Sequence, residues 1–208
     1  TIGRRQRQMC IRDRFSTVTS DNFAGGKALA EFLVAGGHRR IGYIAGWEGA
    51  STQRDREAGF CAGLAEHGHK LFARGVGDFR TETAANAARA MFSASEFPDA
   101  VFVANDHMAF AVIEELRGNL GLRVPEDVSV VGYDDVQLSR WSSFDLTTVR
   151  QPSGEMVAET VAALMAQIED GETEPRRVKI DGPLVVRGSA RRPADWKANW
   201  KECDDERL

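Results

Sequence analysis

The sequence predicts an α/β fold with a mostly parallel sheet and helices on both faces of that sheet. Short apolar segments with strand character alternate four times with longer segments of helical periodicity along the 208 residues. This alternation is typical of right-handed βαβ units, whose helices cover a parallel sheet on both sides. The composition agrees with a packed core, because 42% of the residues are hydrophobic and 28% are charged.

Strands are predicted where short apolar or β-branched runs stop at glycine, asparagine or aspartate. The two clearest strands are Ala100–Ala104 (AVFVA) and Val128–Tyr133 (VSVVGY), which are apolar along almost their whole length. The other predicted strands are Phe15–Val18, Arg40–Ala45, Leu71–Val76, Leu146–Val149, Arg177–Ile180 and Leu184–Val186.

Helices are predicted where apolar residues recur every three or four positions between capping residues. Ser20, Asp21 and Asn22 offer N-caps before Ala24–Ala35, and Gly36-Gly37 ends that helix. The other predicted helices are Arg54–His67, Thr81–Phe92, His107–Leu120 and Gly154–Asp170. The last of these carries five apolar residues on one side: Met156, Val157, Val161, Leu164 and Ile168.

Polar side chains and one aromatic ring follow consecutive predicted strands. Asn105 and Asp134 come directly after the two clearest strands, Thr52 and Arg56 follow the strand before them, and Phe79 follows the weakest one. Ligands of parallel sheets bind beyond the carboxyl ends of the strands, so these side chains are expected to share one edge. Arginine donates hydrogen bonds, aspartate accepts them and asparagine does both, which suits a neutral polyhydroxylated ligand. The phenyl ring offers a flat apolar face to a sugar or a base.

Each of these residues also has a purely structural explanation. Asp106 is a candidate helix cap, Arg56 and Asp134 are a candidate structural ion pair, and Phe79 is a candidate core residue. Their joint placement favours the binding interpretation, because ligand sites gather a few convergent polar groups in a cleft.

Seven segments between Ser20 and Arg191 resemble the effector-binding region of the LacI/GalR family of transcription regulators, in the family's order. The segments are DNFAGG (21–26), GHRRIGYIAG (37–46), REAGF (56–60), ANDHMA (104–109), GLRVPEDVSVVGYDD (121–135), LTTVRQP (146–152) and LVVRGS (184–189). Together they span more than four fifths of the chain.

The resemblance implies a periplasmic-binding-protein-like lobe within a truncated two-lobe architecture. Carried over residue by residue, it makes Arg56, Asn105 and Asp134 the recurrent effector contacts. Phe79 falls where the family stacks an aromatic ring, and Thr52 falls where a small hydroxyl residue contributes. Gln151, at the crossover between lobes, is a further effector-binding candidate.

The family's partners follow from the same resemblance. The effector is expected to be a sugar, a nucleoside or a purine, and the parent protein is expected to be a cytoplasmic homodimer. Operator DNA is expected to be bound only through an N-terminal domain that is missing from this sequence. No cofactor, metal, membrane or enzymatic activity is implied.

The resemblance also sets expected boundaries. Residues 15–150 are predicted to form the second lobe, 151–180 a remnant of the first lobe, 181–191 a strand that returns toward the second lobe, and 192–208 a polar tail. Residues 1–14 carry five arginines and are predicted to be disordered or foreign to the protein. Within them, Met9–Arg14 resembles a translated sequencing adapter.

Composition and motifs argue against several other classes of protein. A net charge of −4 is unfavourable for direct DNA binding, and three scattered cysteines form no disulfide framework or zinc site. A periplasmic sugar-binding protein of a transporter is the main alternative, although the expected secretory signal is absent from this sequence. An α/β enzyme is a weaker alternative, because it needs a nucleophile, base or metal at the strand ends.

Overall fold

A computed structural model describes residues 16–169, 174–194 and 196, and within it the chain forms two compact units. The smaller unit holds the residues up to Asp21 and Pro152–Asp181, and the larger unit holds Asn22–Gln151 and the residues from Gly182 onward. The predicted N-terminal segment 1–14 lies outside the described residues, as does most of the predicted tail at 192–208.

The larger unit is built on a six-stranded sheet, which confirms the predicted fold class. Its strands lie in the order β3-β2-β4-β5-β6-β8. The first five are mutually parallel, and β8 runs antiparallel to β6. Their bounds are β2 Ile41–Ala45, β3 Ala73–Val76, β4 Ala100–Val103, β5 Ser129–Asp134, β6 Thr147–Arg150 and β8 Leu184–Val185.

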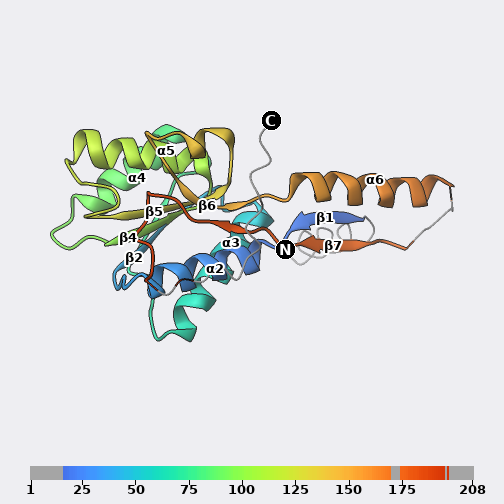
Figure 1. The fold of residues 1–208 in the computed structure, drawn as a ribbon, viewed down its shortest axis with the longest axis horizontal. Coiled ribbons are helices and arrows are strands. Elements are labelled where there is room, and N and C mark those ends of the chain that lie inside the picture. The colour runs from blue at the N-terminus through green and yellow to red at the C-terminus, as the bar shows by residue number, and fades with distance from the viewer. Residues whose placement is uncertain (1–15, 170–173, 195, 197–208) are drawn as a thin grey trace, which may run out of the picture. The chain divides into compact units, whose positions relative to one another are not determined.

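Helices cover both faces of this sheet (Figure 1). The helices α2 (Asn22–Ala35) and α3 (Ser51–Glu66) pack together on one face. The helices α4 (Thr81–Phe92) and α5 (Asp106–Glu114) pack together on the other. The predicted single helix to Leu120 instead changes after Glu114 to a π-helical turn, η1 (Glu115–Asn119).

Aromatic side chains fill the centre of the core. The ring of Phe102 on β4 lies 5.0 Å from the ring of Tyr43 on β2 and 5.0 Å from the ring of Phe60 on α3. All three side chains are fully buried. Each such ring contributes on the order of 1.5–3 kcal/mol through burial, so this cluster fixes α3 against the sheet.

Two glycines bring the backbones of α2 and α3 into unusually close contact. A Cβ atom on Gly26 would lie 2.2 Å from the carbonyl oxygen of Arg56, and one on Gly59 would lie 2.0 Å from that of Phe23. Only residues without a Cβ fit at this distance. The close approach sets Asn22, at the start of α2, beside Arg56 on α3.

The smaller unit consists of two parallel strands and one helix. The strand β1 (Thr17–Ser20) pairs with β7 (Arg177–Ile180), and α6 covers Ser153–Glu169. The prediction placed the first strand at Phe15–Val18 within the larger unit, whereas β1 begins at Thr17 and pairs in the smaller one. The four residues of β1 carry no signal for their partner, which lies about 160 residues away.

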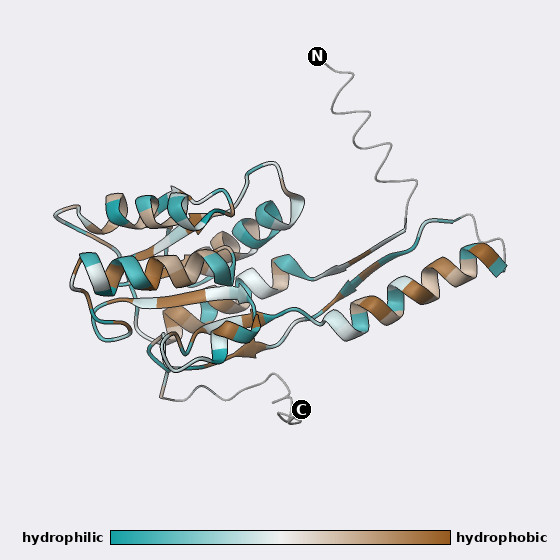
Figure 2. Ribbon diagram, turned by 90° about the horizontal axis from the view of Figure 1, so that it is seen from above, coloured by the Kyte–Doolittle hydropathy of each residue, from teal (hydrophilic) through white to brown (hydrophobic). Residues whose placement is uncertain are grey.

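Most of the apolar side of α6 is exposed. Ala163 is its only buried residue, while Val157, Val161, Leu164 and Ile168 are all more than half exposed. Figure 2 shows the hydrophobic colour recurring along this helix.

The described part of the predicted polar tail packs on the core. Trp196 is half-buried, and its ring meets the ring of Phe32 edge-on at a centroid distance of 5.1 Å. Pro193 is buried as well. These contacts differ from the tail expected from the polar composition of 192–208.

Candidate functional site

The six predicted site residues all lie at the carboxyl edge of the larger unit's parallel strands. Asp134 is the last residue of β5, and Asn105 and Gln151 follow β4 and β6 within two residues. Phe79 follows β3, and Thr52 and Arg56 lie in the first two turns of α3, which follows β2. The shared edge results from the parallel register, which places all five strand ends on the same side.

Arg56 is the centre of the site. Its side chain is 5% exposed, and its Nη2 lies 3.3 Å from Oδ1 of Asp134. Its Nε donates to Oδ1 of Asn22 at 2.8 Å, and its Nη1 donates to the carbonyl oxygen of Ala104 at 2.6 Å. Its guanidinium carbon lies 3.7 Å from the centroid of the Tyr133 ring, which adds a cation–π contact. Four neighbours therefore fix the orientation of this guanidinium.

Asp134 joins Arg56 to Gln151. Its Oδ1 also accepts a hydrogen bond from Nε2 of Gln151 at 3.0 Å, and its carbonyl oxygen accepts one from the Gln151 amide at 3.2 Å. Its φ of 122° lies in a region that residues with a side chain rarely adopt. Within the described part of the chain, the buried Oε1 of Gln151 has no hydrogen-bond donor.

Asn105 is the N-cap of α5, a role that the sequence analysis considered for Asp106. Its Oδ1 accepts a hydrogen bond from the amide of Met108 at 3.1 Å. Its Nδ2 makes no hydrogen bond among the described residues and remains able to donate. Asn105 can therefore hold the helix and still offer two N–H donors at the sheet edge.

Phe79 and Trp47 add aromatic surface to the same edge. Phe79 is 38% exposed, so it is not a core residue. Its ring packs on Gly46, where an added Cβ atom would lie 2.2 Å from the nearest ring carbon. Trp47 follows β2 after one residue and is 59% exposed. Trp47 was not among the predicted site residues, although a tryptophan directly after a strand-ending glycine is a recognisable signal.

Thr52 is half-buried and lies one helical turn before Arg56. Residues four apart share a helix face, so Thr52 lies on the same face of α3 as Arg56. The neighbouring Gln53 is buried, and its Oε1 accepts hydrogen bonds from Tyr43 at 2.7 Å and from the amide of Gly46 at 2.9 Å. These bonds fix the loop between β2 and α3.

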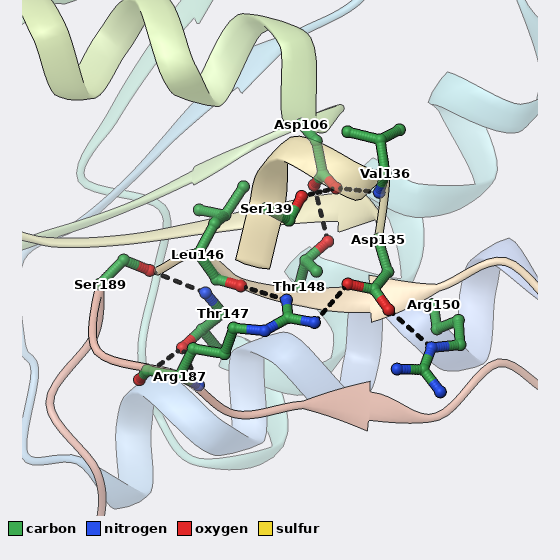
Figure 3. Close-up of polar contacts among 10 residues, drawn as sticks. All are labelled: Asp106, Asp135, Val136, Ser139, Leu146, Thr147, Thr148, Arg150, Arg187 and Ser189. Carbon is green, nitrogen blue, oxygen red and sulfur yellow. Dashed lines mark hydrogen bonds and ion pairs between the residues drawn. The ribbon is translucent and has the colours of Figure 1, made fainter. Parts of the chain in front are cut away.

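Two buried carboxylates support the loop that follows Asp134 (Figure 3). Asp106 accepts hydrogen bonds from the hydroxyls of Ser139 and Thr148, both at 2.7 Å, and from the amide of Val136 at 3.0 Å. Burial raises the pKa of Asp106, and these three donors oppose that rise. The carboxylate of Asp135 is fully buried, a position that the sequence analysis did not single out.

The arrangement presents donors and acceptors with little net charge. The Arg56 guanidinium faces the Asp134 carboxylate, and Asn105 and Gln151 contribute amides. Such groups hydrogen-bond a neutral polar molecule, while the exposed rings offer it an apolar face. Within 16–169, 174–194 and 196, there is no group of three or more His, Cys, Asp or Glu that could hold a metal ion.

The sequence is similar to a known domain family and to named transcription regulators. A family model described as a periplasmic binding protein-like domain matches residues 30–190. The "HTH-type transcriptional repressor PurR" of Photobacterium profundum is 34% identical over 169 residues, which is 80% of this chain and 50% of that protein. The chain spans about half the length of the curated relatives it matches.

Solved structures of regulators have the same fold. The structure titled "transcriptional regulator CelR-cellobiose complex" superposes with a TM-score of 0.79 at 35% identity, covering 85% of this chain and 54% of that one. A dimeric Lac repressor with a C-terminal deletion superposes with a TM-score of 0.80 at 29% identity, covering 86% and 66%. None of the described helices is long and apolar enough to cross a bilayer.

Proposed function

Because the chain belongs to the periplasmic binding protein-like domain family, we propose that it is the effector-binding part of a LacI/GalR-type transcription regulator whose effector is a neutral sugar. The matched relatives are named as transcription regulators, which favours this class over a transporter's binding protein. In the whole protein, operator DNA would be bound by a part of the relatives' length that this chain does not span, and the protein would act as a homodimer.

The observation that supports a neutral sugar is the ion pair between the buried Arg56 and the partly buried Asp134. The guanidinium is already matched by one carboxylate at 3.3 Å, so a ligand that brought its own charge would leave one charge unbalanced in a partly buried place. A sugar hydroxyl both donates and accepts, so it can bond to the pair and to Nδ2 of Asn105 without adding charge. Phe79 and Trp47 would cover the apolar face of its ring.

The proposal is tested by the thermal stabilisation of the purified chain by a panel of small molecules. The panel contains cellobiose, glucose, gluconate and adenosine, which separate neutral sugars from an acidic sugar and from a nucleoside. A ligand that binds only the folded state at a hundred times its dissociation constant stabilises that state by about 2.7 kcal/mol. We expect cellobiose or glucose to raise the unfolding temperature, and gluconate and adenosine to have no effect.

The matched variants are Asp134→Asn and Asp127→Asn. Both remove one carboxylate charge, but Asp127 pairs with Arg123 at the surface, at 2.6 Å. Loss of a charge-assisted hydrogen bond costs about 1.5–3 kcal/mol, so Asp134→Asn is expected to weaken sugar binding roughly ten- to a hundredfold. Asp127→Asn is expected to leave sugar binding unchanged. Stabilisation by adenosine alone, or equal sugar binding by both variants, would contradict the proposal.

A further inference from the structure

The chain passes between the two units at three places. The connections lie between Asp21 and Asn22, between Gln151 and Pro152, and between Asp181 and Gly182. Side chains at or close to each connection are hydrogen-bonded to the Arg56–Asp134 pair or to the adjacent Asp135. The candidate site is therefore linked directly to the connections between the units.

Asn22 links the first connection to Arg56. This residue begins the larger unit, is 4% exposed and accepts the Nε–H of Arg56 at 2.8 Å. Arg56 reaches it across the close contact between α2 and α3, where Gly59 meets the carbonyl oxygen of Phe23. Asn22 therefore lies between the guanidinium and the chain that enters the larger unit.

Two residues link the second connection to the carboxylates of Asp134 and Asp135. Gln151, its last residue in the larger unit, donates from Nε2 to Asp134 at 3.0 Å. Arg150, the residue before it, donates from Nε to Oδ2 of Asp135 at 2.6 Å. Adjacent residues at the end of β6 are thus hydrogen-bonded to adjacent carboxylates at the end of β5.

The third connection is linked through Arg187, five residues after Gly182. Its Nη2 donates to Oδ1 of Asp135 at 2.6 Å, and its Nη1 donates to the carbonyl oxygen of Leu146 at 2.7 Å (Figure 3). Gly182 itself packs on the end of β6, where a Cβ would lie 2.3 Å from the carbonyl oxygen of Arg150. Asp135 therefore binds one arginine from the segment that leaves the larger unit and one from the segment that returns to it.

The backbone joins the two carboxylates tightly. Asp134 and Asp135 have φ values of 122° and 54°, in the region where residues with a side chain are rarely found. Such conformations persist only when surrounding contacts determine them, and here those contacts are the ion pairs of the two side chains. A change in what Asp134 binds is therefore expected to alter the geometry of Asp135.

We propose that Asp135 is a positioning residue that transmits a change at the Asp134 carboxylate to Arg187, and thus to the third connection between the units. The proposal rests on the proposed function only for the nature of the ligand, because the coupling itself can be measured without one. Arg187 makes no bond to Asp134, so Asp135 is the described side chain through which the two communicate.

The test uses NMR signals of the Arg187 guanidinium in the full 208-residue chain. Asp134→Asn is expected to shift these signals in the otherwise unchanged chain. In a background of Asp135→Asn, the added Asp134→Asn is expected to cause no further shift at Arg187. Asp127→Asn is the matched control, and it is expected to shift the signals of Arg123 and to leave those of Arg187 unchanged.

A second variant keeps the test informative if Asp135→Asn fails to fold, which loss of amide dispersion would reveal. Asp135→Glu retains the carboxylate, and a response of Arg187 to Asp134→Asn is expected to persist in it. The proposal would be overturned if Asp134→Asn left the Arg187 signals unchanged, or if it shifted them equally with and without the Asp135 carboxylate. Failure of the proposed function has a different signature, because cellobiose would then leave the signals of Arg56 unchanged.

Discussion

Replacement of Gly59 by alanine tests the helix contact that positions Arg56. A Cβ at this position would lie 2.0 Å from the carbonyl oxygen of Phe23, whereas close carbon–oxygen contacts in proteins are about 3.3 Å. The backbones of α2 and α3 must therefore separate by roughly 1 Å. That movement would also stretch the 2.8 Å hydrogen bond between Arg56 and Asn22.

The expected cost follows from these contacts. Overpacking of a close contact destabilises a protein by about 1–3 kcal/mol, and a weakened hydrogen bond to a charged group adds about 1 kcal/mol. The higher helix propensity of alanine offsets roughly 0.5–1 kcal/mol of this destabilisation. We therefore expect Gly59→Ala to lower the free energy of unfolding by about 1–3.5 kcal/mol, or the unfolding temperature by roughly 2–14 °C in a chain of this size.

The assay is urea and thermal unfolding followed by far-ultraviolet circular dichroism. Gly118→Ala is the matched control, because a Cβ on Gly118 would meet no described atom within 4 Å beyond its chain neighbours and the backbone of its own helix. This control is expected to be neutral or up to about 1 kcal/mol more stable than the original chain. A Gly59→Ala chain as stable as the control would refute the close contact between α2 and α3.

Two further predictions concern pH and local stability. Burial lowers the pKa of His38 from 6.5, so the chain should lose stability as pH falls from that value through the folded-state pKa. Urea unfolding at about pH 7.5 and pH 5.5 should show a smaller loss in His38→Gln than in the original chain, with the exposed His67→Gln as control. In α6, amides should exchange faster with solvent than those of β5, because Ala163 is its only buried residue. Equal protection of α6 and β5 in a monomeric sample would contradict that prediction.

Much of the site could be predicted from the sequence because its residues stand next to strands. Asn105 and Asp134 follow two runs that are apolar along almost their whole length, and a parallel sheet brings such strand ends to one edge. Only the rule for parallel sheets and the order of the elements were needed. The same rule also identified Arg56, and the resemblance to a known family then added Gln151 to the set.

The supporting contacts could not be predicted, because they depend on partners far apart in the chain. Asp135 and Arg187 are separated by 52 residues, and no local pattern relates them. The partner of Asn22 is Arg56, 34 residues away, and their contact requires glycines whose role appears only in three dimensions. The same limit explains β1, whose four residues give no sign of pairing with β7.

The interruption of the helix after Glu114 has a similar origin. Glu115 is buried and accepts hydrogen bonds from Arg89 on α4 at 2.8 and 2.9 Å and from Asn119 at 2.7 Å. The periodicity of the sequence continues through this region, so it predicts an uninterrupted helix. The π-helical turn accompanies polar contacts that periodicity does not encode.

The most direct test of the proposed sugar site is an NMR titration of the 208-residue chain with cellobiose. We expect saturable shifts of the Nε–Hε signal of Arg56 and of the Nδ2 amide signal of Asn105, because both groups lie at the carboxyl edge of the sheet. The Nε–Hε signal of Arg123, bonded to Asp127 at 2.9 Å, should not move. Shifts that spare Arg56 and Asn105 while other signals move would contradict the proposed sugar site.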